Sequence, residues 1–385
     1  MTKKYCIFIT ALFCAFLAFF TVAGAVMPDR EFSEQENRNL QQLPTVDADD
    51  FKLAWPMEES GDFFTGKLMS DFEKYLNDQF PFRDGWITLK AATEVALGKH
   101  ENNNVYLCDE DTLITRFDEP DADRVSTNIN YLNMLVANTD VPVYLSLIPG
   151  PSQIWADRLP DGAPNADQKA IIDDIASRTD AIFYDTYQNL WDHRDEDIYY
   201  RTDHHWTSLG AYYGYVSLME ALGMEPVPLE EYTKQTVSTE FYGTTYSSSG
   251  FRWVRPDNID IYVPDPGVKV TSWFTGTPEE GTLYAWDRLA IKDKYTFFMG
   301  GNQSLAVIEN PNVDGPKIAI LRDSYTDSLV PFLTAHFSEI HLIDLRYNRN
   351  SVPQYLEEND IDTCVMLYSV SNFVTDTNFF SLAQG

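Results

Sequence analysis

The sequence predicts an α/β protein, in which a parallel sheet is flanked by helices and is preceded by an N-terminal membrane segment. From about Asn104 onward, short apolar strands alternate with amphipathic helices, which is typical of parallel strand–helix–strand units. Residues 141–148 form a continuous apolar run, as expected of a strand buried on both faces of such a sheet. The chain also begins with an apolar segment long enough to cross a bilayer.

This N-terminal segment has the plan of a membrane anchor or an export signal. Lys3 and Lys4 precede a run from Tyr5 to Val26 that contains no charged side chain. The run is long for the apolar part of a signal peptide, so an uncleaved anchor is favoured, with cleavage after Ala25 as the alternative. The two lysines place the rest of the chain outside. The predicted location is therefore extracytoplasmic, either anchored in the membrane or secreted.

The composition narrows the classes of partner. The formal net charge of −31 argues against nucleic acid and against an anionic membrane surface, because both would repel the chain. The 22 Tyr and 24 Phe predict a substantial core. Outside the apolar segment only Cys108 and Cys364 remain, so a zinc-type cysteine pattern is absent and we expect no metal or other cofactor. The two cysteines form one disulfide or stay free, and a buried free thiol is the commoner state for Cys364.

Residues 28–100 are expected to link the membrane segment, residues 1–27, to the main domain. Residues 28–60 have little periodicity and predict an irregular stalk. Apolar residues at helical spacing then predict one helix over 63–76 and a second that ends near Leu97. We expect one apolar face of this helix pair to pack against the domain that follows.

The main domain is predicted over residues 101–385. Its expected strands are 105–108, 112–115, 141–148, 181–184, 317–321, 339–343 and 362–368, and its expected helices are 124–137, 168–177, 207–222, 325–335 and 352–359. A stretch at about 228–293, rich in Tyr, Ser, Thr and Pro, interrupts this alternation. It predicts an insertion rich in strands or loops.

Three segments are expected at the carboxyl ends of the strands, where ligands collect in a parallel sheet: 149–152, 203–206 and 322–325. On a strand-to-helix turn, the hydroxyl of Ser324 would be exposed as a nucleophile. Asp203 and His205 lie two residues apart and would point to the same side of an extended chain, so the carboxylate can orient the imidazole. By the same alternation, His204 should point to the opposite side and serve a structural role.

Each of these residues also has a plain structural role. Ser324 and Asp203 are common helix caps, and His205 suits a packed core position. Their placement at strand ends, together with the family resemblance given below, favours a Ser–His–Asp triad over these separate roles. Backbone N–H groups near Ser324 would hold an oxyanion. The candidates for further oxyanion donors or for supporting residues are Tyr325, Asn302, Arg322 and His204. For Asn302 the alternative is a role in forming a turn. Tyr246 and Ser248 are candidates for substrate binding.

The segment Arg201–Thr207, followed by Gly210-Ala211, resembles the signature of the DHHW family of exported bacterial proteins. Further matching segments are Phe32–Glu34, Glu36–Arg38, Asn77–Arg83, Phe241–Thr244, Tyr246-Ser247, Gly300–Asn302, Asp323–Tyr325 and Asp344–Tyr347. The resemblance implies an SGNH-hydrolase-like fold, similar to the O-acetyltransferases of alginate and cell-wall polysaccharides. Their Asp-x-His pair ahead of a Ser maps onto Asp203, His205 and Ser324. Arg322 stands where GDSL enzymes have Gly.

Three functions follow as hypotheses. The first is an extracytoplasmic O-acetyltransferase or esterase acting on a cell-surface or secreted polysaccharide, which would need a membrane partner that supplies acetyl groups because acetyl-CoA is absent outside. The second is a catalytically inactive glycan-binding or scaffold protein of the cell envelope. The third, ranked lowest, is a metal phosphoesterase with an Asp-His-His motif, because further Asp-rich ligand motifs are not evident.

Overall fold

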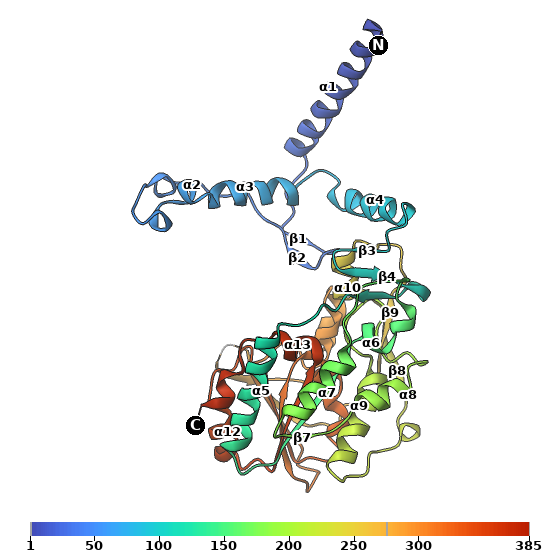
Figure 1. Cartoon of the computed structure of the whole chain (residues 1–385), viewed down its shortest axis with the longest axis vertical. Coiled ribbons are helices and arrows are strands. Elements are labelled where there is room, and N and C mark those ends of the chain that lie inside the picture. Colours follow the sequence, from blue (N-terminus) through green and yellow to red (C-terminus); the bar gives the residue numbers. More distant parts are fainter. Residues whose placement is uncertain (1, 275, 385) are drawn as a thin grey trace. The chain divides into compact units, whose positions relative to one another are not determined.

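The computed structural model describes residues 2–274 and 276–384 (Figure 1). The chain forms two units, one of Met1–Lys99 with Gly250–Arg252 and the other of His100–Ser249 with Trp253–Gly385. The boundary near residue 100 agrees with the place where the sequence pattern changes from linker to alternating strands and helices.

The first unit is built from helices and a small β-ribbon. Helix α1 spans Lys3–Val26 and is, among the described residues, the one helix long and apolar enough to cross a membrane by length and composition. The ribbon pairs β1 (Phe32–Ser33) with β2 (Arg38–Asn39), antiparallel. The remaining helices are α2 (Asp62–Thr65), α3 (Lys67–Asp78) and α4 (Arg83–Ala96).

Ion pairs join the β-ribbon of this unit to the turn between α3 and α4. Arg38 donates two hydrogen bonds to Asp78, and this contact is the main reason that the pKa of Asp78 is lowered. Arg83 pairs with Glu36, and Arg30 with Asp84 at 2.7 Å. The segments 32–38 and 77–83 are thus partners in one network, which is why the stalk is not irregular throughout.

The second unit contains an eight-stranded sheet in the order β11-β10-β12-β14-β13-β15-β6-β7. The five strands from β14 to β7 are parallel, and β12, β10 and β11 extend the sheet with antiparallel pairs. Their bounds are β6 (Val143–Ile148), β7 (Ile182–Phe183), β10 (Lys269–Trp273), β11 (Pro278–Glu280), β12 (Leu305–Glu309), β13 (Lys317–Arg322), β14 (Glu339–Ile343) and β15 (Thr363–Ser369). Two smaller sheets consist of β3 (Glu101–Asn102), β4 (Val105–Leu107) and β5 (Leu113–Thr115), and of β8 (Gln235–Phe241) and β9 (Asp257–Ile261).

Helices cover both faces of the large sheet (Figure 1). On one side α5 packs against α7 and α13, and on the other α9 packs against α8 and α11. The helices of this unit are α5 (Ala122–Ala137), α6 (Pro151–Ile154), α7 (Gln168–Arg178), α8 (Tyr187–Asp192), α9 (Ser208–Ala221), α10 (Thr244–Ser249), α11 (Val330–Leu333), α12 (Val352–Glu358) and α13 (Val370–Thr375). The starts of several helices have the capping residues that the sequence indicated: side chains of Asp121, Asp167 and Thr207 accept backbone N–H groups of α5, α7 and α9.

The structure differs from the expected elements in two places. The region 228–293 is not wholly an insertion, since β10 and β11 lie within it and extend the main sheet through β12. The helix expected over 325–335 is instead a 3₁₀ turn, η8 (Ser324–Ser328), followed by the short α11. Pro331 stands in the first turn of α11 and has no N–H to continue a helix from before it, so it favours a new start there. The cysteines Cys108 and Cys364 are both buried free thiols.

Candidate active site

Ser324 lies at the carboxyl edge of the parallel strands. β13 ends at Arg322, beside the last residues of its neighbour β15, which in turn pairs with β6. Asp323 follows as the cap of η8, and Ser324 is the first residue of that turn. The nucleophile candidate therefore stands where a parallel sheet places its ligands.

Ser324, His205 and Asp203 form a continuous hydrogen-bonded chain. Ser324 Oγ is 2.7 Å from His205 Nε2, and His205 Nδ1 is 2.5 Å from Asp203 Oδ1. Asp203 and His205 are buried, whereas Ser324 is partly exposed. An acid, an imidazole and a hydroxyl in this order provide a base that can take the hydroxyl proton and an acid that orients the base.

The segment from Arg201 to His205 is a series of bends rather than an extended strand. The backbone N–H of His205 donates to Asp203 Oδ1 at 3.0 Å, so the chain folds back over the carboxylate. The expectation that His204 points away from His205 is therefore wrong, because strand alternation does not apply here. The two imidazole rings are 3.9 Å apart, and His204 Nδ1 lies 2.7 Å from Thr244 Oγ1.

Thr244, which sequence reasoning missed, completes the hydrogen bonding of Asp203. Its backbone N–H and hydroxyl donate to Asp203 Oδ2 at 2.6 and 2.9 Å. Burial alone would raise the pKa of Asp203, but the neighbouring charges of His204 and His205 and these hydrogen bonds lower it below its usual range. Gly243 permits this approach, since a Cβ there would lie 2.2 Å from Asp203 Oδ2.

Tyr295 supports the imidazole from its other face. Its ring stacks on that of His205, with centroids 3.8 Å apart and planes 8° apart. Its hydroxyl donates to the backbone oxygen of Ser324 at 3.1 Å and lies 3.2 Å from Ser328 Oγ. Burial raises the pKa of this phenol well above its ordinary value, which keeps it a donor. Nothing in the local sequence pattern distinguishes Tyr295 from the other tyrosines near it.

Asp323 fixes the turn that carries Ser324. Its Oδ1 accepts the backbone N–H of Tyr325 at 3.0 Å, and its Oδ2 accepts Ser369 N, Ser369 Oγ and Asn372 Nδ2 at 2.7–2.9 Å. The Tyr325 N–H is therefore engaged, and the Tyr325 hydroxyl donates to the backbone oxygen of His204. Tyr325 holds the His204 backbone and the Ser324 turn together.

Arg322 is fully buried beneath this turn. Its Nη2 donates to Gln303 Oε1 at 2.5 Å, and its Nη1 pairs with Asp327 Oδ1 at 2.7 Å. Burial raises the pKa of Asp327 to about 7, although the Arg322 charge acts in the opposite direction. Since no part of Arg322 is exposed, its role is to brace the turn and not to contact a substrate.

The remaining candidates are Asn302, Tyr246 and Ser248. Asn302 is exposed and directly follows Gly300 and Gly301, which both have positive φ, so its roles as turn former and as oxyanion donor both stay predictions. The ring of Tyr246 packs on that of Tyr242, with centroids 4.4 Å apart. Ser248, by contrast, lines a cleft that adjoins the triad.

This cleft has a volume of about 380 Å³ and is lined by His204 and Tyr325. The rest of its wall consists of small hydroxyl, amide and aromatic side chains with one arginine, including Arg116, Phe117, Ser152, Thr244, Thr245, Ser248, Ser371 and Asn372. Neither this cleft nor a larger cavity of about 550 Å³ that is lined by Tyr199 and Tyr262 has Ser324 or His205 in its wall, but only the smaller cleft is lined by their direct chain neighbours His204 and Tyr325. The smaller cleft is therefore the one beside the reactive groups.

Asp203, His204 and His205 are also close enough to hold a metal ion, since their ligand atoms lie within 4.8 Å of one another. Both oxygens of Asp203 and both ring nitrogens of His205 already take part in hydrogen bonds within the protein. A cation would have to displace them. The arrangement thus fits proton transfer better than metal binding.

Comparisons with known proteins agree with this architecture. The family model for DHHW protein matches residues 142–343. A DHHW family protein from Eubacterium siraeum superposes with a TM-score of 0.64 at 26% identity, over 73% of this chain and 95% of that chain. Bacillus cereus PatB1, solved with a sulfonyl adduct, superposes with a TM-score of 0.62 at 21% identity, over 73% of this chain and 100% of that chain. The O-acetyltransferase domain of Pseudomonas putida AlgJ superposes with a TM-score of 0.45 at 14% identity, over 72% of this chain and 95% of that chain. No curated protein sequence matches the chain.

The likeness to the E. siraeum and PatB1 structures confirms the predicted α/β fold with its parallel sheet flanked by helices. What the site does must be argued from its own geometry.

The buried pair beneath Ser324 generates a stability prediction. Arg322→Met leaves the Asp327 carboxylate buried without its cation and should lower the free energy of unfolding by about 3–5 kcal/mol. The double variant Arg322→Met, Asp327→Leu should recover most of this loss. Urea unfolding of the detergent-solubilised chain, followed by tryptophan fluorescence, measures both. Equal losses in the single and double variants would contradict the account.

The stacked Tyr295 generates a second prediction, which separates its ring from its hydroxyl. Tyr295→Leu removes the ring that supports the imidazole as it becomes charged and should slow the reaction of Ser324 with a sulfonyl fluoride by about tenfold. Tyr295→Phe keeps the ring and should stay within about threefold of the unmodified protein. The rates are measured by intact mass, with thermal unfolding as the control for folding. The idea fails if the leucine variant is folded and reacts as fast as the phenylalanine variant.

Proposed function

The chain belongs to the DHHW family, and we propose that it is an extracytoplasmic O-acetyltransferase, or an esterase, acting on a cell-surface or secreted polysaccharide. Ser324 is the nucleophile, His205 the general base and acid, and Asp203 the residue that orients His205. The observation that carries the proposal is the pair of distances from His205, 2.7 Å to Ser324 Oγ and 2.5 Å to Asp203 Oδ1.

The reaction proceeds in two transfers of one acetyl group. His205 Nε2 accepts the proton of Ser324 while Oγ attacks the carbonyl carbon of the acetyl donor, and the leaving group departs with that proton. The acetyl group is then an ester of Ser324. A sugar hydroxyl, or water in an esterase, gives its proton to His205 and attacks this ester. His205 returns this proton to Ser324 Oγ as the ester bond breaks, so the products are the O-acetylated sugar, or acetate, and free Ser324.

The developing oxyanion needs a donor close to Ser324. The N–H of Tyr325 is bound to Asp323 and is not assigned this role, whereas Asn302 keeps its assignment as a second candidate donor. The backbone N–H of Ser324 itself is the donor in this proposal. Donors of this kind lower the barrier by about 3–4 kcal/mol in comparable reactions.

The cleft beside His204 and Tyr325 is assigned to the sugar acceptor. Its hydroxyl and amide groups suit a polyhydroxylated ligand, and Phe117 offers a ring for stacking on a sugar face. Arg116 also lies in the wall of the cleft, but its positive charge is balanced by ion pairs with Glu101 and Asp118. Ser248 keeps its assignment to substrate binding, whereas Tyr246 is not among the residues that line the cleft.

The place of reaction follows from helix α1, whose length and composition suit a membrane anchor or a signal sequence. We assign it to an uncleaved anchor with the catalytic unit outside; cleavage after Ala25 would release the same unit. Acetyl-CoA is absent outside the cell. A transferase there requires a membrane partner that passes acetyl groups across, whereas an esterase does not.

Ser324→Ala should abolish sulfonylation by phenylmethylsulfonyl fluoride and should lower the hydrolysis of p-nitrophenyl acetate to the rate of the uncatalysed reaction. The reason is that the variant lacks the hydroxyl that becomes acylated. The matched control is Ser177→Ala, an exposed serine on α7, which should behave as the unmodified protein. Intact mass and ester hydrolysis measure the two effects, and the acetyl content of surface glycan measures the biological one. A well-folded unmodified protein that takes up no sulfonyl group would favour the inactive glycan-binding alternative.

A further inference from the structure

The helices of the first unit carry large apolar side chains that this unit leaves exposed. In α3, Leu68, Phe72 and Leu76 repeat every fourth residue and form one stripe, while Lys74 and Asn77 lie on the opposite face. Phe72 and Leu76 are 41% and 53% exposed, and Leu68 is half-buried. A soluble helix would bury such a stripe, so this face is built to meet something apolar.

Neighbouring segments of this unit carry further exposed apolar side chains. Trp86 and Leu89 on α4 are 41% and 55% exposed, and Phe63 and Phe64 on α2 and Phe80 and Phe82 in the turn before α4 are exposed as well. Three short helices and one turn thus contribute aromatic and aliphatic side chains. We name this set, Phe63, Phe64, Leu68, Phe72, Leu76, Phe80, Phe82, Trp86 and Leu89, the apolar platform.

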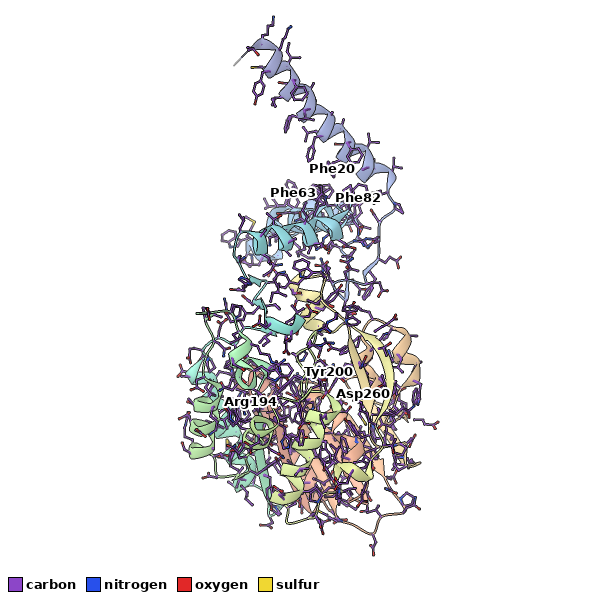
Figure 2. All side chains as sticks on the ribbon, turned by 90° about the vertical axis from the view of Figure 1, so that its right-hand side faces the viewer. Phe20, Phe63, Phe82, Arg194, Tyr200 and Asp260 are labelled. Carbon is purple, nitrogen blue, oxygen red and sulfur yellow. The ribbon has the colours of Figure 1, made fainter. Side chains whose placement is uncertain are left out.

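Contacts with the end of α1 connect the platform to the membrane segment. Phe20 stacks on Phe80, with centroids 5.4 Å apart and planes 14° apart, and lies 5.9 Å from the ring of Trp86. Phe19 is stacked at 6.4 Å on Phe82. Figure 2 shows Phe63 and Phe82 on the side of this unit that faces Phe20. Because these contacts involve the last turns of α1, the platform lies at the depth where that helix leaves the hydrocarbon.

We infer that the apolar platform is seated in the outer-leaflet interface of the membrane, with lipid as its occupant. This inference rests on the proposal that α1 remains as an anchor. Amphipathic helices lie in this layer with their apolar face toward the acyl chains, and tryptophan and other aromatic rings are enriched there. Attraction to charged lipid headgroups does not account for this position in the membrane. The polar side of α3 carries acidic and basic residues that pair with each other, as Lys74 with Asp71 and Lys67 with Asp62. A zwitterionic bilayer suffices.

The seating gives the catalytic unit a broader attachment than one helix and a short stalk. The Arg38–Asp78 and Arg83–Glu36 pairs hold the β-ribbon to the turn next to the platform, so the chain leaving α1 is fixed at the membrane surface. Attachment to the membrane surface would be the role of the motif segments 32–38 and 77–83, which lie outside the α/β unit that holds Ser324.

Spin labels on the full-length chain in phosphatidylcholine vesicles test the seating. Cys6 and Cys14 are replaced by serine, the buried Cys108 and Cys364 are kept, and a nitroxide is attached at Phe72→Cys on the platform. Lys74→Cys on the opposite face of α3 is the matched control, and Phe13→Cys within α1 is the lipid reference. Power saturation compares collisions with oxygen, which concentrates in lipid, and with a water-soluble nickel chelate. The ratio of oxygen to nickel accessibility should be several-fold higher at residue 72 than at residue 74.

Two results at residue 72 would overturn the inference. Ready access to the nickel chelate means that the face is in water, and low access to both reagents means that protein covers it. The label at residue 13 separates this failure from failure of the anchor: a lipid signal there with a water signal at 72 removes only the platform. Sulfonylation of Ser324 reports on the proposed chemistry independently of either outcome.

Discussion

The carboxylate of Asp203 lies in the protein interior, where a charged group is stable only when hydrogen bonds and nearby cations replace water. Two donors come from His205 and two from Thr244, so both oxygens are engaged. The need to hydrogen-bond both oxygens of this buried carboxylate determines much of the local structure. It bends the chain between Asp203 and His205, draws the start of α10 over the carboxylate, and requires glycine at position 243. The imidazole is held in one orientation as a result.

A second set of constraints holds the nucleophile against that imidazole. Asp323 fastens the turn after β13 to the end of β15, and the buried Arg322 supports it from below through Asp327. Trp206, next to the imidazole, donates to the backbone oxygen of Tyr325, and it fits only because Gly214 leaves room, since a Cβ there would lie 2.6 Å from its ring. Short contacts across three distant segments thus position a hydroxyl to within hydrogen-bonding distance of a base.

The sequence allowed the parallel strands to be predicted because apolar runs are local signals. Ser324, His205 and Asp203 were predicted from their strand-end positions together with the resemblance to the DHHW family. It did not reveal β12 or β10, whose pairing depends on partners far along the chain. Tyr295 and Thr244 were missed for the same reason: they reach the site through tertiary packing. His204 was placed on the wrong side because alternation was assumed in a segment that the buried carboxylate bends.

The central claim is that Asp203 orients His205 so that His205 activates Ser324. The most direct measurement is the rate at which Ser324 reacts with phenylmethylsulfonyl fluoride in Asp203→Asn, with circular dichroism to establish folding. The amide can favour the wrong tautomer of His205, so the account predicts a rate lower by roughly 10³–10⁴-fold in a folded protein. A folded Asp203→Asn variant that reacts at the unmodified rate would contradict it.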